Sequence, residues 1–182
     1  GLVELARLRA GESVLVHAAA GGVGSAAVRL ADQLGADVFA TASPPKHDYV
    51  RALGVPASLI RSSRDTGYAE AFAAETGNRG VDVVLNSLPG ELIEKSFALL
   101  RSQGRFVELG KRDYYANNQL GLRPFLRNLS FSLVDLRAMM LERPARVRAL
   151  FEELLGLIAT GAFTTPPIAT LPIGQVVEAF QK

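Results

Sequence analysis

The sequence predicts an α/β fold in which helices cover both faces of a doubly wound sheet of six parallel strands. Two observations carry this prediction. Six short apolar runs rich in β-branched residues alternate with stretches of helical spacing, and a glycine cluster directly follows the first run. The right-handed crossover between parallel strands then favours the doubly wound arrangement.

The N-terminal part of the chain supplies a helix and the first strand. Leu2, Leu5 and Leu8 share one face if residues 2–9 are helical, so a helix is expected there. Residues 13–19, "SVLVHAA", have the apolar profile of a strand buried on both faces.

The elements after the glycine cluster repeat this alternation. Residues 25–35 have helical spacing and end at Gly35, residues 36–43 form the second strand, and prolines open a helix over 44–54. The remaining expected strands cover 57–63, 80–88, 104–110 and 129–136, and the remaining helices cover 67–77, 91–100 and 143–161.

Two stretches do not fit this count. Residues 113–128 are expected to be irregular. The proline-containing tail is expected to hold a single strand over 167–173 and a terminal amphipathic helix, as in a segment that returns to a neighbouring domain.

Composition narrows the function classes. A chain of 182 residues with 48% hydrophobic and 21% charged residues is ordinary globular material. A net charge of +2 with scattered basic residues argues against nucleic-acid and membrane partners, and without cysteine there is no disulfide or thiolate metal site. We expect an excised domain, because the chain starts without Met, and a cytoplasmic location.

The glycine cluster "AAGGVG" predicts a dinucleotide pyrophosphate site. Aligned on G-x-G-x-x-G, it places Ala19 at the first glycine, Gly21 at the second and Gly24 at the third. The backbone N–H groups of Gly22, Val23 and Gly24 would then face the phosphates at a helix N-terminus. The alternative is a tight strand-to-helix turn without a ligand.

The end of the second strand favours NADPH over NADH. An acidic residue for the ribose hydroxyls is typical of NAD sites, but "TASPPK" has none. Ser43 and Lys46, with Arg64 after the third strand, suit the 2′-phosphate of NADPH. The alternative is that both cations are solvated surface charges.

Four segments together resemble the medium-chain dehydrogenase/reductase superfamily, and within it the enoyl reductase domains of modular polyketide synthases and animal-type fatty acid synthases. The segments are "VLVHAAAGGVG", "ATASPPK", "GVDVVLNSL" and "GRFVELGKRD". The resemblance implies a Rossmann-like NADP-binding domain over residues 1–163. It implies that residues 164–182 return to a GroES-like substrate subdomain that is mostly absent from this chain.

The resemblance also implies an activity, which is zinc-independent, NADPH-dependent reduction of a trans-2-enoyl thioester on an acyl carrier protein. Hydride goes to the β-carbon and a proton to the α-carbon. Lys111 matches the family's proposed proton donor or enolate stabiliser, and Asp135 matches its acidic partner. The alternatives are an exposed loop cation at Lys111 and a helix cap at Asp135.

Three further polar residues lie near strand ends. Asn86 and Ser87 resemble residues that line the nicotinamide ribose, with a polar turn as the alternative. His17 is interpreted as a hydrogen-bonded core histidine rather than an acid.

Two other functions stay open. One is an NADPH quinone oxidoreductase-like enzyme, and the other is a non-catalytic NADP-binding or dimerisation module. The expected partners are the enoyl thioester on its carrier protein, other domains of the same synthase chain, and a second copy paired through the last strand.

Overall fold

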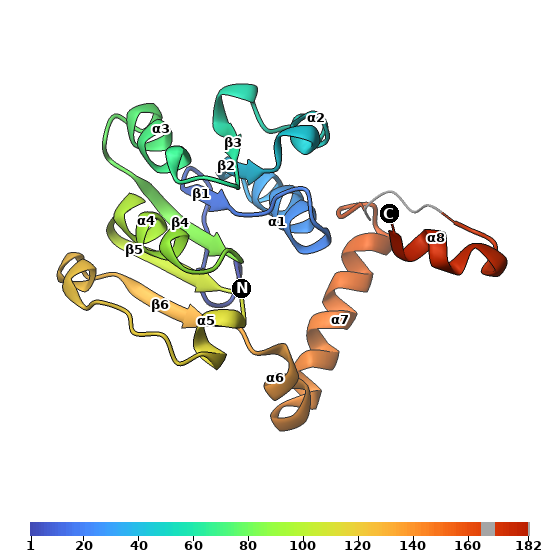
Figure 1. Cartoon of the computed structure of the whole chain (residues 1–182). Helices are drawn as coiled ribbons and strands as arrows, with labels where there is room; N and C mark the ends of the chain where they lie inside the picture. Colours follow the sequence, from blue (N-terminus) through green and yellow to red (C-terminus); the bar gives the residue numbers. More distant parts are fainter. Residues whose placement is uncertain (165–169, 182) are drawn as a thin grey trace.

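The computed structural model describes residues 1–164 and 170–181 and has at its centre a six-stranded parallel sheet of order β3-β2-β1-β4-β5-β6 (Figure 1). The order reverses between β1 and β4, where a doubly wound sheet opens a crevice at the carboxyl ends of its strands. The predicted Rossmann-like fold is therefore confirmed. The strands are β1 Ser13–Val16, β2 Asp37–Ala42, β3 Ile60–Ser62, β4 Val81–Asn86, β5 Leu100–Glu108 and β6 Ser130–Leu133.

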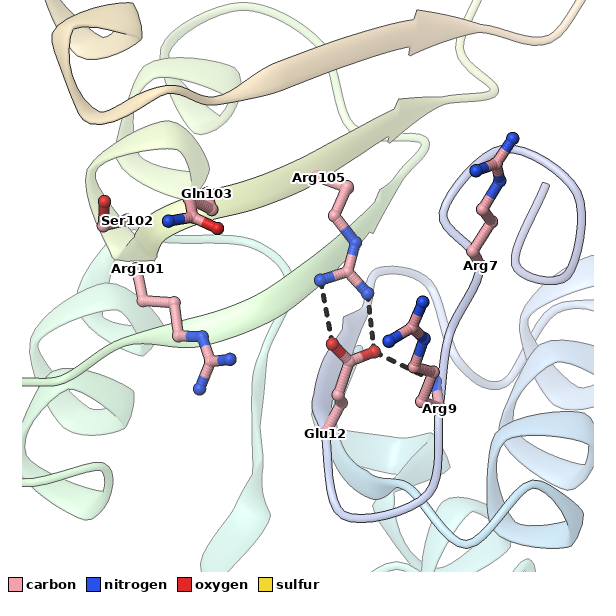
Figure 2. Close-up of a pocket in the computed structure, with 7 residues that line it drawn as sticks. All are labelled: Arg7, Arg9, Glu12, Arg101, Ser102, Gln103 and Arg105. Atoms are coloured by element: carbon pink, nitrogen blue, oxygen red, sulfur yellow. Dashed lines mark hydrogen bonds and ion pairs between the residues drawn. The ribbon is translucent and has the colours of Figure 1, made fainter.

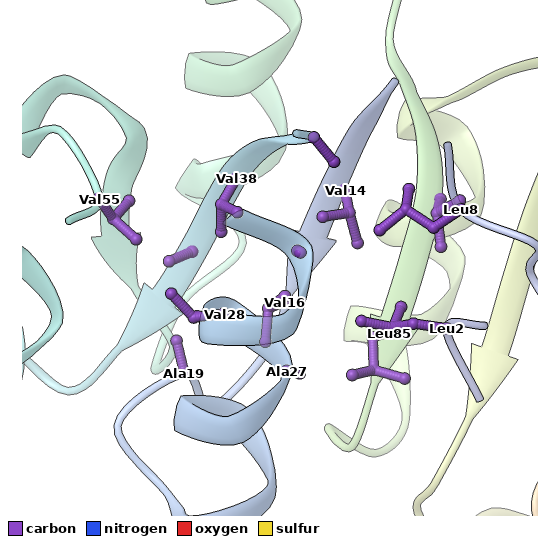
Figure 3. Close-up of a cluster of buried hydrophobic side chains, with 14 of the residues drawn as sticks. Leu2, Leu8, Val14, Val16, Ala19, Ala27, Val28, Val38, Val55 and Leu85 are labelled. Carbon is purple, nitrogen blue, oxygen red and sulfur yellow. The ribbon is translucent and has the colours of Figure 1, made fainter. Parts of the chain in front are cut away.

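The central strands are apolar on both faces because helices cover both. In β1, Val14 and Val16 belong to one buried cluster and Leu15 to the other, and all three are fully buried. Figure 3 shows the first cluster, where α1 lies across β1 and β2. Tyr68 and Phe97, from helices of the opposite layer, belong to the second cluster.

Helices connect the strands in the order that the sequence predicts, with a few additions. The short α5 was not expected from the sequence, and α6 was expected only in the alternative in which Asp135 caps a helix. The strand β5 begins four residues earlier than the expected 104–110. The α-helices are α1 Gly22–Gln33, α2 His47–Ala52, α3 Gly67–Glu75, α4 Glu91–Leu99, α5 Arg112–Tyr115, α6 Leu136–Glu142, α7 Pro144–Ala159 and α8 Val176–Gln181.

The helix predicted over residues 2–9 is wrong. The segment forms turns, with Arg7 in the left-handed region at φ 49°, a conformation that interrupts a helix. Leu2 and Leu8 are buried in the first core cluster, whereas Leu5 is 45% exposed. Packing of two leucines onto the sheet therefore decides the conformation, rather than the helical spacing of three.

The C-terminal part lies beside the sheet rather than within it. Of the residues in α7, only Val147 is buried, and the helix stands to one side of the sheet, beside α1, in Figure 1. The strand expected over 167–173 lies partly outside the described residues, and residues 170–173 are not in a strand. The division into 1–163 and 164–182 stays a prediction. In the described part of the chain, every helix is too short or too polar to cross a membrane.

Candidate functional site

The turn between β1 and α1 is built on a close approach that only glycine allows. Ala18 adopts a left-handed φ of 50°, and the Gly21 N–H donates to the Ala18 carbonyl at 2.9 Å. A Cβ on Gly24 would lie 2.7 Å from the Ala19 Cα, inside van der Waals contact. Gly24 therefore holds the start of α1 against the end of β1, as predicted for the third glycine of the motif.

The first turn of α1 presents free backbone donors. Its first backbone hydrogen bond runs from the Ser25 N–H to the Gly21 carbonyl at 2.8 Å, which leaves the N–H groups of Gly22, Val23 and Gly24 without an intrahelical acceptor. No acidic residue lies in this turn. A Cβ on Gly22 would meet nothing within 4 Å, so the space beside the donors is open. These residues fit a pyrophosphate group.

The predicted 2′-phosphate residues lie at the carboxyl ends of two paired strands. Ala42 of β2 is opposite Ser62 of β3, so the loops that carry Lys46 and Arg64 leave the same edge of the sheet. Both cations are exposed, and Ser43 is half-buried before the 3₁₀ turn Pro44–Lys46. Within the described ranges, neither cation pairs with a carboxylate within 4.0 Å.

A buried carboxylate, which sequence reasoning missed, joins the ends of β4 and β5. Glu108 is 6% exposed, and its Oε2 accepts a hydrogen bond from Asn86 Nδ2 at 2.6 Å. Its Oε1 accepts from the Gly110 N–H at 2.5 Å. Burial raises the pKa of Glu108 above its usual range, and these two hydrogen bonds oppose the rise. The only sequence signal was an acidic residue at the end of a buried strand.

The Asn86 side chain is buried and makes hydrogen bonds within the protein, whereas its predicted role is contact with the nicotinamide ribose. Its side chain is fully buried, and Nδ2 donates to the Leu88 carbonyl at 2.8 Å as well as to Glu108. The neighbouring Ser87 is exposed at the same strand end. Contact of Asn86 and Ser87 with a nicotinamide ribose stays a prediction.

Lys111 and Asp135 lie on the loops that follow β5 and β6. Lys111 is exposed and precedes α5, while Asp135 caps α6 by accepting from the Ala138 N–H at 3.0 Å. The Lys111 ammonium and the Asp135 carboxylate do not form an ion pair within 4.0 Å in the described structure. The helix-cap alternative for Asp135 is therefore observed, and its catalytic role stays a prediction.

His17 is a hydrogen-bonded core histidine, as interpreted from the sequence. Its ring nitrogens lie 2.8 Å from Thr41 Oγ1 and 2.8 Å from Ser96 Oγ. Tyr68 Oη is also 2.8 Å from Ser96 Oγ. Burial lowers the pKa of His17 to about 3, so the ring is neutral at physiological pH.

The opposite, amino edge of the sheet carries an arginine-rich hollow of about 460 Å³ (Figure 2). There Arg105 Nη1 and Nη2 donate to both oxygens of Glu12, at 3.0 and 2.6 Å. Arg101 pairs with the buried Asp82 at 2.5 Å. This edge lies away from the crevice, and these two pairs join strands and the N-terminal segment. The exposed guanidinium groups of Arg7 and Arg9 form no ion pair within 4.0 Å in the described structure.

Comparison with protein families gives a match over residues 22–156 to the family described as "Zinc-binding dehydrogenase". The chain itself has no cysteine. Among residues 1–164 and 170–181, no three His, Cys, Asp or Glu side chains are grouped so that they could hold a metal ion. The described residues therefore do not fit a zinc site.

Curated relatives are long polyketide synthases. The spectinabilin polyketide synthase system protein NorB of Streptomyces orinoci is 50% identical over 182 residues, covering 100% of this chain and 8% of that protein. A mycocerosic acid synthase-like polyketide synthase of Mycolicibacterium smegmatis is 42% identical, again over 100% of this chain and 8% of that protein. The chain thus spans about 8% of the length of these relatives.

Solved structures narrow the match to one part of such synthases. The nucleotide-binding subdomain of the enoylreductase domain of PpsC from Mycobacterium tuberculosis has a TM-score of 0.84 and 42% identity, over 91% of this chain and 92% of that chain. The CurK enoyl reductase has a TM-score of 0.85 and 39% identity, over 100% of this chain and 53% of that chain. The chain therefore belongs to the zinc-binding dehydrogenase family and, within it, to the nucleotide-binding subdomains of polyketide synthase enoyl reductases.

Proposed function

We propose that this chain is the NADPH-binding part of an enoyl reductase that reduces a trans-2-enoyl thioester held on an acyl carrier protein. The observation that carries the proposal is the combination at the carboxyl edge of the sheet. Free N–H groups at the start of α1 lie at the end of β1, and the neighbouring β2 and β3 lead to two exposed cations instead of an acid. This combination suits a dinucleotide with an extra phosphate.

The nucleotide is bound by backbone and by charge. The N–H groups of Gly22, Val23 and Gly24 donate to the pyrophosphate, with the α1 dipole behind them. Lys46 and Arg64 attract the 2′-phosphate, and the Ser43 hydroxyl donates to it. When bound, NADPH supplies the hydride that goes to the β-carbon of the substrate.

Lys111 is the proposed proton donor or enolate stabiliser. As hydride arrives, negative charge develops on the thioester oxygen, and an ammonium nearby lowers the energy of that state. A proton must then reach the α-carbon, which the Lys111 Nζ can supply. Asp135 orients this lysine in the proposal, through the carboxylate whose Oδ1 also caps α6.

The assembly is proposed to include other domains of the same synthase and a second copy of the chain. The edge strand β6 presents Phe131 and Leu133, which are 42% and 38% exposed. Pairing of two copies through such an edge would cover both side chains. The alternatives remain a quinone oxidoreductase-like enzyme and a non-catalytic NADP-binding module. The relatives, which are reducing polyketide synthases and enoyl reductases, favour the enoyl reductase.

Two measurements test the proposal. First, the chain is titrated with NADPH and NADH while the fluorescence of the nicotinamide is followed, and NADPH should bind at least about ten-fold more tightly. Second, a protein that carries this chain together with its substrate subdomain should oxidise NADPH in the presence of a crotonyl thioester. Equal affinity for the two nucleotides would refute the cofactor assignment. Turnover of quinones but not of the thioester would favour the quinone oxidoreductase.

A further inference from the structure

Lys111 lies on a short segment that is hydrogen-bonded to the end of β4 on one side and to the β4–α4 loop on the other. Before it, Glu108 accepts from Asn86 Nδ2 at 2.6 Å and from the Gly110 N–H at 2.5 Å. After it, the Asp113 carboxylate accepts from the N–H of Gly90, at 3.2 and 3.3 Å. The first contact joins the ends of β4 and β5, and the second joins the loops that follow them, at the carboxyl edge of the sheet.

The burial of the Glu108 carboxylate, which lies at the centre of this connection, is energetically unfavourable. The Glu108 carboxylate has no Lys, Arg or His nitrogen within 4.0 Å in the part of the chain that the structure describes. A buried carboxylate without a counter-ion costs more free energy than an apolar side chain of similar size. Its hydrogen bonds from Asn86 Nδ2 and the Gly110 N–H offset part of this cost. Asn86 and Glu108 are opposite each other in the sheet.

The hydrogen bond between Gly110 and Glu108 requires a glycine at position 110. A Cβ at Gly110 would lie 2.8 Å from Glu108 Oε1, inside the distance that two non-bonded atoms tolerate. The absence of a side chain therefore lets the Gly110 N–H reach the carboxylate. The next residue is Lys111, so the hydrogen bond fixes the backbone from which the lysine side chain extends.

We infer that Glu108 is a positioning residue, which sets Lys111 relative to the end of β4 by holding Asn86 Nδ2 and the Gly110 N–H at the same time. The inference rests on the proposed enoyl reductase function. Lys111 itself is exposed and long, so the position of its backbone limits where its ammonium can go. A misplacement of about 1 Å in an active site can cost about 10²-fold in rate.

The first test is the substitution Glu108→Gln with Glu12→Gln as its matched control. A glutamine has one acceptor oxygen, so it turns its NH₂ group toward either Asn86 Nδ2 or the Gly110 N–H and loses that contact. We expect kcat with a crotonyl thioester to fall about ten- to hundred-fold, with KM for NADPH within about two-fold. Glu12 bonds to Arg105 of the same strand at the opposite edge, so Glu12→Gln should leave kcat per folded protein unchanged. A kcat of wild-type size in Glu108→Gln would overturn the inference.

A double-mutant cycle separates positioning from a general structural role. In a Lys111→Ala background, Glu108→Gln should lower kcat by less than about two-fold, because the group that it positions has been removed. An equal loss of kcat in both backgrounds would show that Glu108 acts independently of Lys111, and the inference would be wrong.

A readout without turnover keeps the inference separate from the proposed function. A PpsC subdomain of nearly the same extent has been solved as a chain of its own, so NMR of this 182-residue chain is feasible. In wild type, the short hydrogen bond to Glu108 Oε1 should shift the Gly110 amide proton downfield, and Glu108→Gln should move the Gly110 and Lys111 amide signals. Unmoved signals would refute the hydrogen bond between Glu108 and the Gly110 N–H, and the inference with it. If these signals move, but the protein that carries this chain with its substrate subdomain reduces no thioester, the enoyl reductase function would be refuted and the Glu108–Gly110 hydrogen bond would stand.

Discussion

At the amino edge of the sheet Arg105 pairs with Glu12 and Arg101 with Asp82, whereas at the carboxyl edge Glu108 and Lys111 have no partner of opposite charge within 4.0 Å in the described structure. Figure 2 shows how the amino-edge guanidinium of Arg105 is met by both oxygens of Glu12. Both edges are formed by the ends of the same strands, so the sheet alone does not explain why, in the described part of the chain, ion pairs form at one edge and are absent from Glu108 and Lys111 at the other.

The charged groups of the two edges have different roles. Asp82 is 3% exposed and also accepts from the backbone N–H of Ser13 at 2.9 Å, so its charge fastens β1 to β4. At the carboxyl edge, Gly22 and Val23 at the start of α1 and the cations after β2 and β3 are exposed. The ion pairs of Arg105 and Arg101 at the amino edge stabilise the fold, whereas the cations after β2 and β3 at the carboxyl edge are available to an anionic ligand.

The largest expected effect comes from Gly24→Ala, which would break the carboxyl edge. The new Cβ would lie 2.7 Å from the Ala19 Cα, so strand and helix must separate. We expect a loss of about 3 kcal/mol in the free energy of unfolding, measured by urea denaturation, together with loss of NADPH binding.

Gly22→Ala is the control for this substitution. Its Cβ meets nothing within 4 Å, so the free energy of unfolding should change by less than about 0.5 kcal/mol. NADPH affinity should still fall, because the methyl group enters the space assigned to the pyrophosphate. Full NADPH affinity in Gly22→Ala would show that the phosphates lie elsewhere.

The second prediction concerns pH and the histidine buried beneath the carboxyl edge. The pKa of His17 is about 3 in the folded protein against 6.5 for the ordinary group, so between these values the unfolded chain binds a proton that the folded chain does not. Stability therefore falls as pH falls through this window, by about 2 kcal/mol between pH 7 and pH 5. Urea denaturation at both pH values measures it, with His17→Gln as the control. An equal pH dependence in His17→Gln would assign the effect to other groups.

The sequence predicts the elements whose signals are local. The apolar runs of β1 and β4 and the glycines from Gly21 to Gly24 each indicate their structure within a few residues. Contacts between distant residues are not readable in this way. The Asn86–Glu108 bond requires the register of β4 against β5, and the turn at residues 2–9 requires the surface onto which Leu2 and Leu8 pack.

The third prediction tests the amino edge with Glu12→Gln. Burial alone would raise the pKa of Glu12, but hydrogen bonds from Arg105 and Arg9 and the charges of Arg105 and Arg101 hold it below the usual 4.5. The ionised group therefore contributes stability above pH 4.5, and this contribution is lost as pH falls through the lowered value. Glu12→Gln should cost about 1.5 kcal/mol at pH 7 and less in acid.

NADPH affinity is the control measurement for Glu12→Gln. Because Glu12 lies at the amino edge, the substitution should leave the Kd for NADPH within about two-fold of wild type. A large loss of affinity would show that the two edges are coupled and would weaken the division of roles between them.

The smallest expected effect distinguishes ligand-directed charge from ordinary surface charge. Lys46→Ala and Arg64→Ala should each weaken NADPH binding about five-fold, or about 1 kcal/mol, since an exposed cation that meets a phosphate is partly screened by solvent. NADH binding should not change, because NADH lacks the 2′-phosphate. Arg51→Ala is the matched control. Arg51 is also an exposed cation, in the helix α2 that follows Lys46, but it already pairs with Asp48.

Salt separates these variants further. The difference between wild type and Lys46→Ala should shrink as ionic strength rises, because the Debye length falls from about 10 Å at 0.1 M to about 3 Å at 1 M. If Lys46→Ala and Arg51→Ala weaken NADPH binding equally, the cations after β2 and β3 act only through the net charge of the chain. The α1 backbone would then still bind the pyrophosphate, which both nucleotides share, and discrimination between NADPH and NADH would have to come from residues other than Lys46 and Arg64.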